Sequence, residues 1–173
     1  MPTITPIYSA EAIKARVDSL ARDIDNFIPH SEEPLLVVIV LRGSLFFAAD
    51  LLRNLHRETE LRFITASSYK GGTESTGSVD LVMEQELMSG RTVLIVEDII
   101  DTGRTLKRIV EEYDKHGAKK IYTVAFLDKP SRRVVDFNVD FSGFEIEDLF
   151  VVGYGMDYDE KYRSIPYIGH FQD

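Results

Sequence analysis

The chain has 173 residues, of which 44% are hydrophobic and 28% charged, a balance typical of one globular domain large enough for a sizeable core. Its formal net charge of −9 disfavours nonspecific binding to nucleic acid or to an anionic membrane, and the lack of cysteine excludes disulfides and cysteine-ligated metal. The N-terminal residues show no signal sequence and the longest apolar run is too short to cross a bilayer, so we expect a cytoplasmic protein.

Residues 9–28 have the period of an amphipathic helix. The apolar stripe consists of Ala10, Ile13, Val17, Leu20, Ile24 and Phe27. Ser9 is well placed to cap this helix, and Glu11 suits the positive end of its dipole. The pattern predicts a helix with one face against the core.

A continuous apolar run follows at 35–40, as expected of a central parallel strand covered on both faces. It ends in a short polar loop, Leu41-Arg42-Gly43-Ser44, and a second helical pattern begins at Phe46. Strand, polar loop and helix N-terminus together form a potential anion site. Taken alone, however, Arg42 is more often a surface charge than a ligand-binding residue.

Strand patterns recur at 61–66, 79–83 and 91–96. Between the first two lies a segment, 70–78, with three glycines and no apolar residue. Its composition fits a surface hairpin, and it fits equally well a loop that covers a bound ligand.

The run from Val93 to Leu106 organises the rest of the chain. Four apolar residues predict a buried strand; carboxylates then follow at 97, 98 and 101 in what we expect to be an acidic turn, and Thr-Gly-Arg-Thr leads into a helix that Gly117 ends. Backbone N–H groups at a helix N-terminus favour a phosphate, and neighbouring carboxylates can accept from sugar hydroxyls. A ribose 5-phosphate fits this pattern. The simpler alternative is that Asp101 or Thr102 only caps the helix.

The remaining chain contains one more buried strand, at 121–127, after which the alternation of strands and helices ends. Strands that alternate with helices predict a parallel sheet whose ligand lies at the carboxyl ends of the strands. After this come a basic turn at 129–133, short strands at 141–146 and 150–154, and an acidic, tyrosine-rich segment at 155–163. Composition alone describes this last third as a solvated face over a small aromatic core.

The fourteen residues from Val93 to Leu106 closely resemble the phosphoribosyl-pyrophosphate motif of the purine phosphoribosyltransferases, in particular the hypoxanthine-guanine type. The first pyrophosphate loop of that family matches Leu41-Arg42-Gly43, and the resemblance extends over nearly the whole chain. It implies an α/β, type I phosphoribosyltransferase fold: a central, mostly parallel sheet flanked by helices, with a small hood from the C-terminal and N-terminal segments. It also implies one domain, 1–173, with the hood drawn mainly from 128–173.

The resemblance also implies roles for particular residues in binding the ribose donor. Glu97 and Asp98 match the carboxylates that engage the ribose hydroxyls and magnesium, and Asp157 matches a carboxylate for a second magnesium. Asp101 matches the catalytic acid/base that faces purine N7. The 5′-phosphate cradle corresponds to Thr102, Gly103, Arg104 and Thr105. The pyrophosphate contacts correspond to Leu41, Arg42, Gly43, Ser68, Tyr69 and Arg163, of which Ser68 and Tyr69 would be brought over the site by the 70–78 loop.

Three further residues match those that read the base. Lys129 corresponds to the lysine that donates to O6 of a 6-oxopurine, Phe150 to the ring that stacks on the base, and Val151 to the backbone that reads its edge. An ammonium group is a donor only, so it favours an oxo group over an amino group. By itself, a phenylalanine is far more often plain core.

The family resemblance therefore implies a magnesium-dependent enzyme of purine salvage. It would transfer the phosphoribosyl group from phosphoribosyl pyrophosphate to N9 of hypoxanthine and guanine, as a homodimer or homotetramer, without nucleic acid or membrane partners. Two alternatives stay open: a transferase that prefers xanthine and guanine, and a non-enzymatic regulator that uses the same fold to sense nucleotides. The second should carry a basic face, and no segment is basic over more than a few residues.

Overall fold

The computed structural model describes residues 3–65, 67–68, 79–80 and 89–172. Five strands form the central sheet, in the order β3-β2-β6-β7-β8, and each neighbouring pair is parallel. These strands are β2 (Leu35–Leu41), β3 (Thr59–Thr65), β6 (Thr92–Ile100), β7 (Lys120–Asp128) and β8 (Phe141–Glu145). The α/β class and the parallel sheet predicted from the sequence are confirmed.

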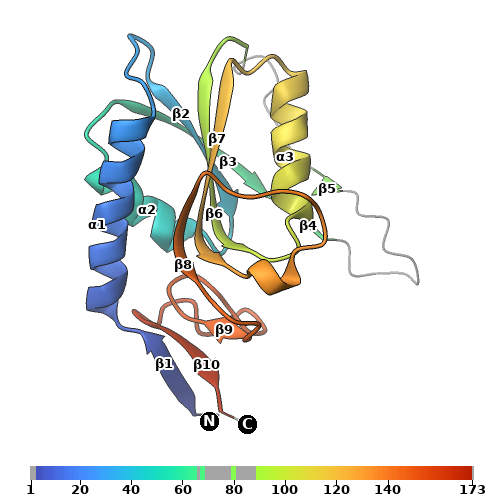
Figure 1. The fold of residues 1–173 in the computed structure, drawn as a ribbon. Helices are drawn as coiled ribbons and strands as arrows, with labels where there is room; N and C mark the ends of the chain where they lie inside the picture. The colour runs from blue at the N-terminus through green and yellow to red at the C-terminus, as the bar shows by residue number, and fades with distance from the viewer. Residues whose placement is uncertain (1–2, 66, 69–78, 81–88, 173) are drawn as a thin grey trace.

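Helices cover both faces of this sheet (Figure 1). On one face, α1 (Ala10–Phe27) and α2 (Leu45–Asn54) pack against alternate strand residues such as Val37 and Leu94. On the other face, α3 (Arg104–Lys115) packs against the residues in between, such as Val38 and Ile95. The continuous apolar run of β2 is thus explained, because both of its faces are buried.

The first helix follows its predicted pattern except at its end. The Ser9 hydroxyl accepts a hydrogen bond from the Ala12 amide at 3.2 Å, so the predicted cap is confirmed. Phe27 was expected on the buried stripe, but its side chain is 63% exposed. As the last residue of the helix it lies at the rim of the core, where its ring meets Tyr122 and Phe141 edge-on.

A second, small antiparallel sheet joins the two ends of the chain (Figure 1). Its order is β1-β10-β9, formed by β1 (Ile4–Tyr8), β10 (Ile168–Phe171) and β9 (Val151–Val152). This sheet is the expected hood, although neither β1 nor β10 was predicted as a strand. A 3₁₀ turn, η2 (Pro130–Arg132), occupies the predicted basic turn, and β4 (Ser67–Ser68) pairs with β5 (Val79–Asp80). Among the described residues, no helix combines the length and apolar character needed to cross a membrane.

Candidate active site

Two adjoining hollows open at the carboxyl ends of β2, β6 and β7. The first, of about 270 Å³, lies between the 41–43 loop, the end of β6 and the start of α3. The second, of about 250 Å³, lies between the end of β6 and the hood, with Lys129, Phe150, Val151 and Asp157 in its wall. Asp98, Ile99 and Asp101 line both. The site therefore lies where the parallel sheet predicted it, and it has two compartments.

The loop at 101–103 presents the N-terminus of α3 to the first hollow. Gly103 is the N-cap residue with φ +83° and offers no side chain of its own. The Thr102 hydroxyl accepts a hydrogen bond from the Arg104 amide at 3.4 Å, whereas the Asp101 carboxylate accepts from Arg132. The simpler reading of an ordinary cap therefore holds for Thr102, through one long hydrogen bond, and is wrong for Asp101. Gly103 and Thr105 line the hollow at the N-terminus of α3, which suits an anion.

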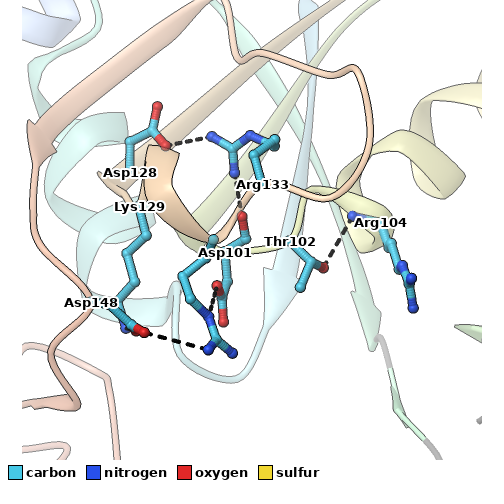
Figure 2. A network of polar contacts seen from close by, with 8 residues as sticks. Asp101, Thr102, Arg104, Asp128, Lys129, Arg133 and Asp148 are labelled. Atoms are coloured by element: carbon cyan, nitrogen blue, oxygen red, sulfur yellow. Dashed lines mark hydrogen bonds and ion pairs between the residues drawn. The ribbon is translucent and has the colours of Figure 1, made fainter.

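Residues from the hood side hold this loop in place (Figure 2). The guanidinium of Arg133 donates to the carbonyl oxygen of Asp101 and also pairs with Asp128. The amide of Val134 donates to the carbonyl oxygen of Thr102 at 3.1 Å. A side chain at position 103 would meet Arg133 at 2.9 Å, so the close approach requires glycine there.

Glu97 and Asp98 lie on a strand, not in the acidic turn that the sequence predicted. Strand β6 continues to Ile100, and its last residues pair with β7, Ile99 opposite Leu127 and Ile100 opposite Asp128. The prediction was wrong because Ile99 and Ile100, beyond the carboxylates, supply branched side chains that extend the strand, Ile100 being fully buried. The two carboxylates are therefore fixed by the sheet.

The same two carboxylates lie close to each other, with Glu97 buried and Asp98 half-buried. Burial raises the pKa of the Glu97 carboxyl well above its ordinary value, and repulsion from Asp98 raises it further. Burial also raises the pKa of Asp98. A Cβ atom on Gly43 would lie 1.6 Å from the Asp98 carboxylate, so a side chain at position 43 would displace that carboxylate.

The 41–43 loop is tied to the hood through an unpredicted residue, Glu160. The Leu41–Arg42 peptide is cis. One oxygen of Glu160, Oε2, accepts from Arg42 at 3.0 Å and from Arg163 at 3.1 Å. Arg163 also donates to the carbonyl oxygen of Gly155 at 2.8 Å and pairs with Asp157 at 3.0 Å. Two cations expected to bind pyrophosphate thus converge on one carboxylate.

The second hollow contains the three residues that the sequence related to base recognition. Lys129 is 8% exposed, and its Nζ lies 3.8 Å from an oxygen of Asp148. The Phe150 ring is 59% exposed and meets Tyr158 edge-on at 5.7 Å, so it is not plain core. Val151 is buried in β9, where it pairs with His170. The hollow combines a buried ammonium with an open aromatic face.

Sequence reasoning missed the acidic and basic partners of these residues. Arg132 donates from Nε to Asp101 at 3.1 Å, and its other end approaches Asp148 at 3.4 Å. The basic turn at 129–133 was visible in the sequence, but only the fold shows that it faces Asp101.

Ser68 lies in β4, opposite Val79. Tyr69 and the predicted cover at 70–78 fall outside the described residues.

Comparison with known proteins gives consistent matches over most of the chain. The family model described as phosphoribosyl transferase domain matches residues 3–159. The hypoxanthine-guanine phosphoribosyltransferase of Lactococcus lactis is 49% identical over 135 residues, 78% of this chain and 73% of that protein. The hypoxanthine phosphoribosyltransferase of Salmonella typhimurium is 44% identical over 168 residues, 96% of this chain and 94% of that protein.

Solved structures give the same result for the fold. The hypoxanthine phosphoribosyltransferase of Staphylococcus aureus superimposes with a TM-score of 0.89 at 37% identity, covering 97% of this chain and 91% of that one. The hypoxanthine-guanine phosphoribosyltransferase of Bacillus anthracis also gives 0.89, at 38% identity, covering 99% of this chain and 100% of that one.

Proposed function

Because the chain belongs to the phosphoribosyltransferase family, in its hypoxanthine(-guanine) branch, we propose that it salvages purines by making IMP from hypoxanthine and GMP from guanine. The ribose donor is phosphoribosyl pyrophosphate, and pyrophosphate is released. The observation that carries the proposal is the pair of hollows that share Asp98, Ile99 and Asp101. One offers a helix N-terminus for a phosphate, and the other a buried ammonium for an oxo group.

In this reaction the bond from C1 of ribose to purine N9 forms as the bond from C1 to pyrophosphate breaks. Positive charge develops on the sugar, so the protein contributes mainly positioning and electrostatics. Asp101, between the two hollows, faces N7 and exchanges the proton that the purine gives up. The amides and hydroxyls of 102–105 hold the 5′-phosphate. Arg42 and Arg163 hold the pyrophosphate.

Lys129 selects the base in this proposal. Its ammonium can only donate, so it rewards O6 of a 6-oxopurine and repels the amino group of adenine. Phe150 stacks on the ring, and the backbone at Val151 reads the far edge. All three line the same hollow.

Magnesium fits the carboxylates at the end of β6. Glu97 and Asp98 are oxygen donors held side by side. A divalent cation favours their charged forms and so offsets the burial that raises the pKa of both carboxyls and the repulsion from Asp98 that adds to the rise at Glu97. The described residues hold no cluster of three or more His, Cys, Asp or Glu that could bind a metal, so further ligands would come from phosphates and water, as Mg²⁺ prefers. Asp157 would serve a second ion. When bound, the metal neutralises charge on the pyrophosphate.

The buried carboxylates predict how stability changes with pH. A carboxyl group whose pKa is higher in the folded than in the unfolded chain stabilises the fold while protonated. This contribution is complete below the ordinary pKa of about 4.3 and is lost as pH rises through the raised pKa. Glu97→Gln should therefore stabilise the metal-free protein at pH 8 by on the order of 1 kcal/mol, with little effect near pH 4.

Urea denaturation at several pH values measures this effect. Glu111→Gln, at an exposed position on α3, is the matched control and should change nothing. A Glu97→Gln effect that is the same at every pH would contradict the account. Addition of magnesium and phosphoribosyl pyrophosphate should then stabilise the wild type more than the variant, because the variant has lost one charged ligand.

A panel of four bases tests the proposed function directly. With phosphoribosyl pyrophosphate and magnesium, we expect hypoxanthine and guanine to be converted to their 5′-monophosphates and adenine to be used at least about 100-fold less efficiently in kcat/KM. Product formation is measured by chromatography. Adenine turnover equal to that of hypoxanthine would refute the role of Lys129. Preference for xanthine would favour the related transferase, and no turnover with any base would favour a nucleotide sensor.

In this proposal the chain forms a single domain and assembles with copies of itself. Core residues of the hood, Tyr154 and Ile168, pack in one cluster with Phe47 and Phe126, which supports a single domain over 1–173. Exposed apolar side chains gather on α2 and the edge strand β3: Leu45, Phe46, Leu61 and Phe63. This favours the predicted homodimer or homotetramer. The cytoplasmic location stays a prediction.

A further inference from the structure

A chain of alternating charges connects the two residues proposed to face the purine. Arg132 donates from Nε to Oδ1 of Asp101 at 3.1 Å and approaches Oδ2 of Asp148 at 3.4 Å. The other oxygen of Asp148, Oδ1, lies 3.8 Å from Nζ of Lys129. The order is therefore Asp101, Arg132, Asp148, Lys129, with the sign of the charge changing at each step.

The inner pair of this chain lies outside the purine hollow. Asp101 and Lys129 line the hollow, whereas Arg132 and Asp148 do not. The side chains of Arg132 and Asp148 are 49% and 53% exposed, and the side chain of Lys129 is 10% exposed. Arg132 and Asp148 thus contact two residues that line the hollow without lining it themselves.

Stability is a poor explanation for this arrangement. An ion pair between half-exposed side chains contributes little to stability, so the two contacts of Arg132 add little to the free energy of unfolding. The contacts do, however, restrict the orientation of the side chains that they join. Asp101 follows the end of β6, and its carboxylate has no cap role at α3. Lys129 has a long side chain whose four rotatable bonds must be ordered for it to hold one position.

The spacing between these two groups matters for a 6-oxopurine. In such a base N7 and O6 are neighbours on one edge, and both must meet their protein partners at once. A displacement of about 1 Å in a reacting group can cost as much as 100-fold in rate. We propose that Arg132 and Asp148 are positioning residues, which set Asp101 against N7 and Lys129 against O6 of the same edge. This rests on the proposed function.

The test uses the full-length protein with alanine, lysine and asparagine substitutions. Arg132→Ala should lower kcat/KM for hypoxanthine about tenfold and leave KM for phosphoribosyl pyrophosphate unchanged, because the ribose donor lies in the other hollow. Arg132→Lys keeps a donor and should recover part of the loss. Arg108→Ala is the matched control: its side chain is 48% exposed and pairs with Glu112 on α3, so kcat/KM should change less than twofold.

An altered base separates this role from a structural one. In 7-deazahypoxanthine a C–H group replaces N7 while O6 is retained, so the compound cannot form the hydrogen bond between N7 and Asp101. Its inhibition constant should change less than twofold in Arg132→Ala and should rise about fivefold in Asp148→Asn, which releases Lys129. In the Asp148→Asn variant, discrimination against adenine should also weaken.

Two results would overturn the inference. One is a loss in Arg132→Ala no larger than that in Arg108→Ala. The other is an inhibition constant for 7-deazahypoxanthine that rises in Arg132→Ala by the same factor by which kcat/KM for hypoxanthine falls. Either result can occur with a fully active wild type, whereas failure of the proposed function would appear as a wild type that does not use hypoxanthine.

Discussion

Asp101→Asn is expected to lower kcat about 100-fold or more while the KM values for both substrates change little. Asparagine has the same shape, and its amide oxygen can still accept the hydrogen bond that Arg132 donates at 3.1 Å. It cannot take up a proton at neutral pH. The change therefore removes proton exchange with N7 and leaves the loop at 101–103 in place. Steady-state kinetics with hypoxanthine measure it.

Glu97→Gln provides the comparison. Its amide oxygen can still accept from a ribose hydroxyl, and the residue is held by β6, so kcat should fall less than in Asp101→Asn. If both variants keep kcat within about a factor of two of the wild type, the carboxylates at the end of β6 are scaffold and carry no chemistry. Thermal denaturation of each variant checks that the fold is retained.

Gly155→Ala is expected to destabilise the protein by about 3 kcal/mol and to raise KM for phosphoribosyl pyrophosphate. Gly155 has φ +100°, which strains any residue with a Cβ. The added Cβ would also lie 2.1 Å from the carbonyl oxygen of Gly43, a backbone atom that cannot turn aside. The hood would have to move away from the 41–43 loop, taking Arg163 with it.

Gly90→Ala is the matched control for this prediction. Gly90 also has a positive φ, +76°, but no atom of the described residues lies within 4 Å of the added Cβ. This variant experiences the backbone strain alone and should lose only about 1 kcal/mol, with unchanged kinetics. Urea denaturation measures both variants. If Gly155→Ala and Gly90→Ala lower the free energy of unfolding equally, the contact between the hood and the 41–43 loop adds no stability.

The parts of the fold that the sequence predicts well are those with local signals. The apolar run of β2, the stripe of α1 with its Ser9 cap, and Gly117 after α3 each follow from spacing within a few residues. Strands β1 and β10 carry no such signal. Each has five residues or fewer, β1 contains a proline, and their partner lies at the opposite end of the chain.

The candidate site likewise contains residues that the sequence predicts and residues that only the fold identifies. The residues that touch the hollows stand in recognisable short motifs, and Asp101, Lys129 and Phe150 line one hollow in the structure. Arg132 and Glu160 could not be assigned from the sequence, because each acts through a tertiary contact. Arg132 contacts Asp101, in the loop after β6, and Glu160 contacts Arg42. A charged residue in a polar segment has no periodic pattern that identifies its partner.

The pairing of the first strand with the last has a consequence for the order in which the enzyme forms during synthesis. The parallel sheet needs nothing beyond β8 and can assemble once residue 145 has left the ribosome. Strand β9, which contains Val151, and strand β1 both pair with β10, so neither can form its hydrogen bonds until β10 has been synthesised. We therefore expect the hollow lined by Lys129, Phe150 and Val151 to be completed last, after the loop at 101–103 has already taken its place at the end of the sheet.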